Sequence, residues 1–179
     1  ERGERYVLQA EELRAAMGSF AAGVTIITTL DAEGKHQAMT ATAFTPVSLQ
    51  PPLCLICIDR RARTHAPLLL HGAFGVSVLG ADQEAIAAQC AAPLQDRLAG
   101  VRWRPGTRTG CPLIHGAVAA MECQLLEVHP GGDHDILLGL VESVQVREGK
   151  PLVYWRARYA ALRTPALEQP AQVAESLAG

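Results

Sequence analysis

The stretch 38–48 reads AMTATAFTPVS and holds the residues best suited to bind a flat ring. Its side chains alternate as in a strand, with Met39, Ala41 and Ala43 on one face and Thr40 and Thr42 on the other. No side chain between Met39 and Phe44 is larger than threonine, so a planar ligand could approach the backbone, with hydroxyl and amide groups free to bind it. An ordinary Ala- and Thr-rich strand would have the same composition. Pro46 cannot donate to a ladder, so the strand should end or lie at a sheet edge there.

A basic segment, RRAR at 60–63, precedes an expected helix start. Thr64 has the side chain of an N-cap, and Pro67 is tolerated only in a first turn, so the helix should begin near His65. Arginines beside a helix N-terminus make an anion site that a phosphate group would fit. Each arginine taken singly could instead be a solvated surface charge.

His134 is the histidine whose surroundings best suit a functional role. Asp133 and Asp135 flank it, and the turn sequence PGGD at 130–133 leads into it. The two carboxylates could orient its ring or favour its protonated form. Taken as an isolated pattern, a histidine of this kind could equally be a surface residue.

The five cysteines predict neither a disulfide framework nor a metal site, because their number is odd and no second ligand pair follows Cys54 and Cys57. Those two cysteines have C-x-x-C spacing, but they lie in LCLICI at 53–58, an expected strand. Residues three apart on a strand face opposite sides, so the pair could not hold one metal ion there. We expect small buried apolar side chains in a protein of the reducing cytoplasm.

The elements that must position these residues follow from hydrophobic periodicity. An apolar stripe formed by Leu13, Met17 and Phe20 predicts an amphipathic helix at about 9–19. Strands are expected at 24–30 and 74–79, at 53–58 with both faces buried, at 121–125 and 144–146 as a hairpin, and at 151–156 as the last strand. Asp82 is expected to cap a helix that runs to about Ala91, and 100–112 is expected to be a loop.

Length and composition bound the class of protein. The chain has 179 residues, 49% of them hydrophobic, which is enough for one domain with a substantial core. The net charge of -2 gives no basic footprint for nucleic acid. No apolar run reaches the length that spans a membrane, and no signal peptide pattern is present at the start. No G-x-G-x-x-G follows a strand, so use of a nicotinamide cofactor would not involve a Rossmann fold.

Several motifs in order resemble the short-chain NAD(P)H:flavin oxidoreductases, the flavin reductase partners of two-component monooxygenases. They are MTATAFTPVSLQPPLCLICIDRRARTHAPL at 39–68, FGVSVL at 74–79, GDH at 132–134 and the segment 156–162. GDHDILLGLVESVQV and RYAAL are most similar to the branch that supplies reduced FMN in antibiotic biosynthesis. The resemblance covers roughly residues 10 to 162. We therefore expect one flavin reductase-like domain at 8–162 and a C-terminal tail at 163–179.

This resemblance implies a mainly β fold, the FMN-binding split β-barrel with a few flanking helices, which generally forms homodimers with flavin near the subunit interface. It implies an enzyme that reduces FMN, or alternatively FAD, with NADH or NADPH, and passes reduced flavin to a transient partner oxygenase. Neither nucleic acid nor a membrane is an expected partner, and no metal is expected.

The same resemblance assigns roles to single positions. The positions that match flavin-binding ones are Met39, Thr40, Ala41, Thr42, Ala43, Ser48, Asp59, Arg60, Thr64, Cys90 and Arg97. Those that match the nicotinamide side are His134, also the candidate catalytic residue, with Arg156 and Tyr159. The chain departs from the pattern at two places, because Cys90-Ala91 and Arg97-Leu98 stand where the family often has Phe-Ala and Lys/Arg-Phe.

Two other functions stay open at this point. The fold also serves bound-flavin oxidases and tailoring enzymes that act on their own substrates. The missing aromatic residues would also suit a non-catalytic flavin-binding module. One fold hosts many functions, so the fold does not decide among them.

Overall fold

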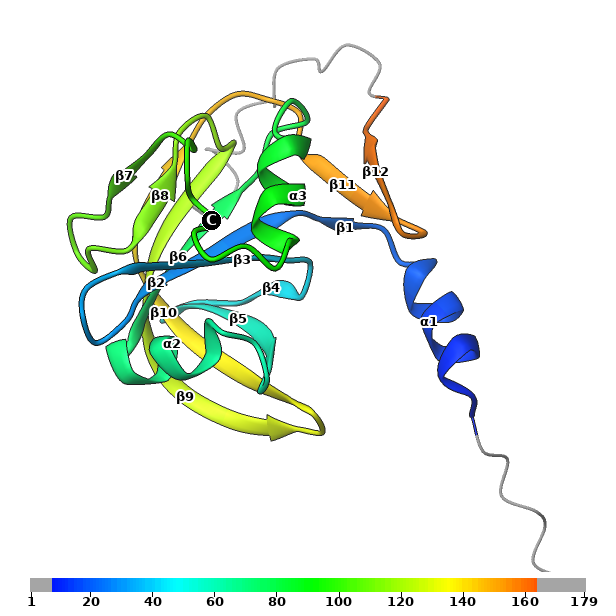
Figure 1. Ribbon diagram of the computed structural model, residues 1–179, viewed down its shortest axis with the longest axis horizontal. Coiled ribbons are helices and arrows are strands. Elements are labelled where there is room, and N and C mark those ends of the chain that lie inside the picture. The colour runs from blue at the N-terminus through cyan, green and yellow to red at the C-terminus, as the bar shows by residue number, and fades with distance from the viewer. Residues whose placement is uncertain (1–7, 164–179) are drawn as a thin grey trace, which may run out of the picture.

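The computed structural model describes residues 8–163, which form twelve strands and three helices. The main sheet has seven antiparallel strands in the order β3-β2-β6-β9-β10-β5-β4 (Figure 1). In that order the strands are His36–Ala41, Thr25–Leu30, Ala73–Val78, Ala119–Gly131, His134–Val146, Pro52–Asp59 and Phe44–Leu49. The edge strands β3 and β4 are consecutive in the chain and only Thr42 and Ala43 separate them, so the sheet must curl until its edges meet there. The result is a barrel that is split between β3 and β4, as the resemblance implied.

Two small sheets complete the fold. One joins β1 (Ala22–Gly23), β11 (Leu152–Trp155) and β12 (Arg158–Ala161), and the other joins β7 (Trp103–Pro105) to β8 (Pro112–Ile114). The β1–β11–β12 sheet lies beside the opening of the barrel, next to helix α1 (Figure 1).

The core has two parts. Inside the barrel, Ile27, Ile56, Phe74 and Leu137 are fully buried in one cluster. Gly139 of β10 is needed there, because a Cβ on it would lie 2.5 Å from the Phe74 ring. The second cluster packs α3 (Glu84–Ala91) against the outside of the barrel through buried residues that include Val24, Ile26, Leu79, Ala87 and Leu152.

The helices differ in how the barrel holds them. Helix α2 (His65–His71) buries Leu68, and α3 lies over β3. Helix α1 (Ala10–Gly18) has no buried residue and projects away from the barrel (Figure 1). No helix within residues 8–163 is long and apolar enough to cross a membrane.

Most sequence-based elements are confirmed. The helix at 9–19 is α1, the strand at 24–30 is β2, and α2 begins at His65 as Pro67 required. Pro46 lies in the edge strand β4, at an irregularity in its pairing with β5. The hairpin of β9 and β10 is also confirmed, and each of its strands has 13 residues.

Five expectations were wrong. The strand expected to run from Met39 to Pro46 is interrupted at Thr42 and Ala43, where the chain passes from β3 to β4, so Ala41 is buried and Ala43 is exposed. The N-cap of helix α3 is Gln83 and not Asp82. The Gln83 side chain accepts the Gly80 N–H and donates to the His115 carbonyl, which fixes the chain at the start of the helix. The expected loop at 100–112 contains β7 and leads into β8, since Trp103 pairs with Ile114 across the turn residues. β11 is not the last strand, because β12 follows it. Strand β5 is fully buried on one face only; Leu55 and Cys57 on its other face are half-buried. Nearly all of the predicted tail, from residue 164 onward, lies outside the described residues.

Candidate functional site

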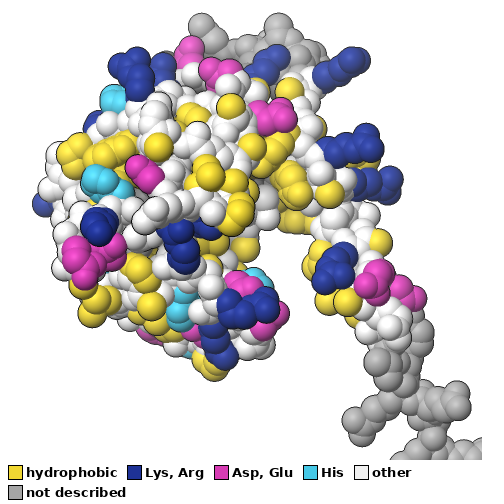
Figure 2. All heavy atoms as spheres, in the orientation of Figure 1, with side chains coloured by type: hydrophobic (Ala, Val, Ile, Leu, Met, Phe, Trp, Pro, Cys, Tyr) yellow, Lys and Arg dark blue, Asp and Glu magenta, His cyan; other side chains and the backbone are white. Residues whose placement is uncertain are grey.

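A groove of about 800 Å³ lies where the two edges of the sheet meet, and we call it the edge groove. Figure 2 shows it as a notch between the barrel and α1. Its lining residues come from the α1 region, the β3–β4 junction, β5 and the end of β11: Met17, Gly18, Phe20, Ala22, Thr42, Ala43, Phe44, Thr45, Leu55, Cys57, Tyr154 and Arg156. A neighbouring cavity of about 210 Å³ shares Thr42 and Tyr154 and adds Thr40 and Tyr159. Most of this lining is apolar.

The β3–β4 junction is held from both sides. The Thr25 hydroxyl donates to the Ala41 carbonyl at 2.8 Å, and the Cys57 N–H donates to the Ala43 carbonyl at 3.1 Å. The expectation of free hydroxyl groups holds for one of the two threonines. Thr40 donates to the Ala87 carbonyl of α3 at 2.6 Å, whereas the Thr42 hydroxyl has no hydrogen-bond partner within residues 8–163 and faces the groove. Met39 and Ala41 pack into the barrel core instead.

The floor of the edge groove continues along β5 towards His134. Asp59 lies two residues beyond Cys57, on the same face of the strand and about 7 Å further along. His134 of β10 pairs directly with Asp59, so the two residues share that face. The His134 ring is partly exposed, and its Nδ1 lies 2.7 Å from Asp133 Oδ1. This hydrogen bond lowers the pKa of Asp133 and orients the ring.

The arginines of the 60–63 segment already have protein partners. Arg60 donates through Nε and Nη2 to Asp135 Oδ1, at 2.8 and 2.7 Å. Arg61 donates to both carboxylate oxygens of Asp59, which lowers the pKa of that carboxyl group. Arg63 donates to the carbonyls of Leu94 and Gln95. These contacts hold the loop in place, and a phosphate at Arg60 would have to compete with Asp135.

Asp135 joins this loop to β10. Besides Arg60, its carboxylate contacts His65 Nε2 at 2.7 Å, and the two partners lower the pKa of Asp135, Arg60 first. Thr64 stands at the N-cap position of α2, but its side chain makes no capping bond. Its hydroxyl is buried and is the one buried side-chain oxygen or nitrogen within residues 8–163 that lacks a partner.

Cys90 and Arg97 hold the segment that follows α3 against β3. Arg97 donates to the carbonyls of Ala92 and Ala38 at 2.9 and 3.0 Å. Cys90 is fully buried, its thiol contacts the Arg97 carbonyl at 3.4 Å, and burial raises its pKa to about 11. Neither side chain lines the edge groove. Ser48 of β4 does not line it either. The Ser48 hydroxyl accepts the Gln50 N–H.

The β11–β12 turn supplies the opposite wall. The Arg156 N–H donates to the Gly18 carbonyl at 2.9 Å, and the Trp155 indole donates to the Ser19 carbonyl at 3.2 Å, so the turn is tied to the end of α1. Tyr154 packs edge-on against Tyr159, with ring centroids 5.4 Å apart. Tyr154 was not among the predicted site residues, although it lies on the same face of the strand as Leu152 and two residues before Arg156.

The structure therefore brings together one part of the predicted site. Thr40, Thr42, Ala43, Arg156 and Tyr159 line the edge groove or its neighbouring cavity, and Asp59 and His134 extend the floor. An apolar groove with a free hydroxyl and one arginine suits a planar ring that carries a polar chain. Within residues 8–163 no group of His, Cys, Asp and Glu side chains could hold a metal ion.

Comparisons with known proteins agree with this geometry. The family described as flavin reductase like domain matches residues 17–163. A flavin reductase (NADH) from Kitasatospora aureofaciens is 38% identical over 175 residues, which cover 96% of this chain and 91% of that protein. A probable flavin reductase from Rhizobium meliloti is 39% identical over 153 residues; the match covers 86% of this chain but only 49% of that longer protein.

A solved structure has the same architecture. The NADH:FAD oxidoreductase of Streptomyces globisporus C-1027, in complex with NAD and FAD fragments, superposes with a TM-score of 0.84 at 36% sequence identity. The match covers 89% of this chain and 98% of that one.

Proposed function

The chain belongs to the flavin reductase-like family, and we propose that it reduces a dissociable flavin with NADH or NADPH and passes the product to a partner monooxygenase. FMN is the proposed flavin, with FAD as the alternative. The observation that carries this proposal is the edge groove, because small residues at the β3–β4 junction open it within the segment that matches the family. An antibiotic-biosynthesis pathway is the proposed setting.

The flavin and the nicotinamide supply the redox chemistry when they are bound. The protein has to bind both rings, orient them and exclude water. Ala43 and Thr42 present little bulk, and the Thr42 hydroxyl is free to bind a ring edge. Leu55, Phe44 and Tyr154 provide apolar walls against which a planar ring can pack. An open groove also fits a flavin that must leave after reduction.

We assign His134 to positioning of the nicotinamide or control of its access. Asp133 holds the imidazole, and pairing with Asp59 puts it in line with the groove floor. No proton transfer at this residue is required. We therefore expect His134→Ala to raise the KM for NADH more than it lowers kcat, because the loss is one of binding. His129→Ala is the matched control, since His129 lies on the same hairpin beside Glu127. An unchanged KM for NADH in steady-state assays would refute this role.

The proposed function is tested by following NADH oxidation at 340 nm with and without added FMN, FAD and riboflavin. Oxidation that requires added flavin and saturates in it is the expected result. The order of preference among the three then identifies the flavin substrate. A protein that arrives with bound flavin and oxidises no NADH under any of these conditions would be a flavoprotein with its own substrate, contrary to the proposal.

Two features of the setting are also proposed. We place the protein in the cytoplasm, and the five free cysteines, four of them buried, support a reducing compartment. We also propose that it works as a homodimer, with the edge groove near the subunit interface. The exposed apolar side chains of α1 support that arrangement, because Met17 and Phe20 form one end of the groove.

A further inference from the structure

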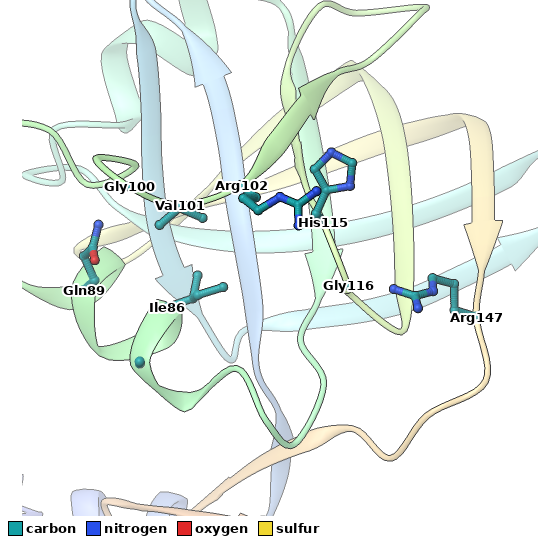
Figure 3. Close-up of a pocket in the computed structure, with 9 residues that line it drawn as sticks. Ile86, Gln89, Gly100, Val101, Arg102, His115, Gly116 and Arg147 are labelled. Carbon is teal, nitrogen blue, oxygen red and sulfur yellow. The ribbon is translucent and has the colours of Figure 1, made fainter.

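A second concave site lies on the outer side of α3 and is lined by basic side chains. Arg102, His115 and Arg147 surround a pocket of about 510 Å³, which we call the basic pocket. Figure 3 shows Arg102 and His115 close together on one side of the pocket, with Arg147 extending towards them from the segment just after β10. An adjoining cavity of about 270 Å³ shares His115 and Arg147 and adds Arg104. Three guanidinium groups and an imidazole therefore line one continuous depression.

The basic side chains of this pocket are unpaired, unlike the arginines of the 60–63 segment. Within residues 8–163, Arg102, His115 and Arg147 form no salt bridge and their side chains make no hydrogen bond. Arg104 has only a weak contact of 3.4 Å with the carbonyl of the next residue. Among the described residues, no carboxylate lines either cavity. Like charges held together without counter-charges favour a multiply charged anion at this place.

Hydrogen bonds hold the backbone of the pocket in place, and the side chains of Arg102, His115 and Arg147 are exposed on it. The His115 N–H donates to the Arg102 carbonyl at 2.9 Å, which fixes the two basic residues relative to each other. Gln83 holds the His115 carbonyl at 2.8 Å, and Gln89 holds the carbonyls of Arg97 and Ala99. The backbone that carries the cations is therefore already in place before a ligand binds.

The remaining lining indicates the kind of anion. Ile86 and Val101 are half-buried and give the pocket an apolar side. Its volume is in the range that holds small organic ligands. Guanidinium groups match phosphate oxygens in a two-pronged geometry, which makes phosphate a better fit than a single carboxylate.

The basic pocket is separate from the edge groove. Helix α3 turns Ala87 and Cys90 towards the barrel, and Ala91 lines the cavity beside the edge groove. Ile86 and Gln89 of the same helix line the basic pocket, and Ile86 also packs against the cluster that contains Ala87 and Cys90. The two cavities share no lining residue.

We propose that the basic pocket binds a phosphorylated small molecule at a site distinct from the edge groove. This binding does not depend on the reductase activity proposed above. Arg102 and Arg147 contact the phosphate groups, and Ile86 and Val101 cover the organic part of the ligand.

The test is isothermal titration calorimetry of the full chain with pyrophosphate at low ionic strength. Arg102→Ala and Arg147→Ala are each expected to weaken binding about tenfold, because each removes a charge-assisted contact to phosphate. Arg108→Ala is the matched control, since Arg108 is exposed and lines neither cavity, and it should bind as the wild type does. Unchanged circular dichroism and flavin-dependent NADH oxidation in the variants show that they are folded.

A second titration, with ADP, tests whether the pocket recognises a nucleotide or the phosphate groups only. Tighter binding of ADP than of pyrophosphate supports a nucleotide, and equal binding supports recognition of the phosphates only. Absence of pyrophosphate binding at millimolar concentration would overturn the proposal. Binding that survives in both arginine variants but is lost in Arg156→Ala would also overturn it, because the phosphate would then lie in the edge groove.

Discussion

Glu122 is a buried carboxylate whose hydrogen-bond donors all come from one short loop. It is 1% exposed, and it accepts the N–H groups of Thr107, Arg108 and Thr109 as well as the Thr109 hydroxyl. Burial raises the pKa of Glu122, but these four donors together outweigh it and leave the pKa below its ordinary value. The carboxylate thereby anchors the turn between β7 and β8 to the barrel strand β9.

Glu122→Gln should destabilise the fold by about 2–4 kcal/mol, because an amide is a weaker acceptor and leaves buried N–H groups without good partners. Glu127→Gln is the matched control, since Glu127 lies on the same strand with an exposed side chain. Urea unfolding followed by circular dichroism measures both. Equal midpoints for the two variants would show that the loop does not depend on Glu122.

The pH dependence of that difference follows from the lowered pKa. The stability that Glu122 contributes is complete above the ordinary glutamate pKa of 4.5 and is lost as pH falls through the lower folded-state value. The gap between wild type and Glu122→Gln should therefore be full at pH 7 and shrink below pH ~4. A gap that grew on acidification would contradict the assignment.

At single positions, the sequence indicated which side chains could bind a ligand, but it did not show which of them are already bound to other residues of the protein. It predicted that small side chains at Thr42 and Ala43 leave room for a planar ligand, and both residues line the edge groove. It could not show that the Thr40 hydroxyl binds the Ala87 carbonyl, or that Arg60 binds Asp135, because these partners are 47 and 75 residues away in the chain. Long-range pairs of this kind leave no periodic signal. For the same reason, nothing in the sequence indicated that the side chains of Arg102 and Arg147 lack partners within residues 8–163.

Among the elements, the β11–β12 hairpin stores backbone strain in its turn. Arg156 and Ala157 have φ of 47° and 59°, the left-handed conformation that a two-residue hairpin loop requires and that glycine or asparagine normally supplies. Because neither residue is a common turn former, no turn was expected between β11 and β12, and β12 was missed. The turn lies at the candidate site, since Arg156 lines the edge groove.

Ala157→Gly should stabilise the protein by about 0.5–1 kcal/mol, because relief of the left-handed strain exceeds the added entropy of the unfolded chain. Ala160→Gly is the control: Ala160 is in the extended strand β12 opposite Val153, so glycine there should destabilise. Thermal unfolding measures both variants. A lower melting temperature for Ala157→Gly would show that the turn does not adopt this conformation.

For the whole molecule, the fold class followed from strand number and motif order, but the position of α1 did not. Its apolar stripe correctly predicted an amphipathic helix and implied that the stripe packs on a core. In the structure the stripe is largely exposed among the described residues: Leu13, Met17 and, just beyond α1, Phe20 are 46%, 64% and 78% exposed. A helix of nine residues is marginal in water without tertiary packing, so an outside surface should bury it.

A second copy of the chain is the partner we propose for this helix, and its loss should be measurable. Met17→Glu combined with Phe20→Glu should convert a dimer into a monomer in light scattering, because two charges would have to be buried in an apolar interface. Leu70→Glu, at an equally exposed leucine on α2, should leave the dimer intact. Flavin-dependent NADH oxidation should fall with the dimer, since Met17 and Phe20 also form one end of the edge groove. A wild-type protein that is monomeric at micromolar concentration would contradict the proposed dimer, and α1 would then cover the groove of its own subunit.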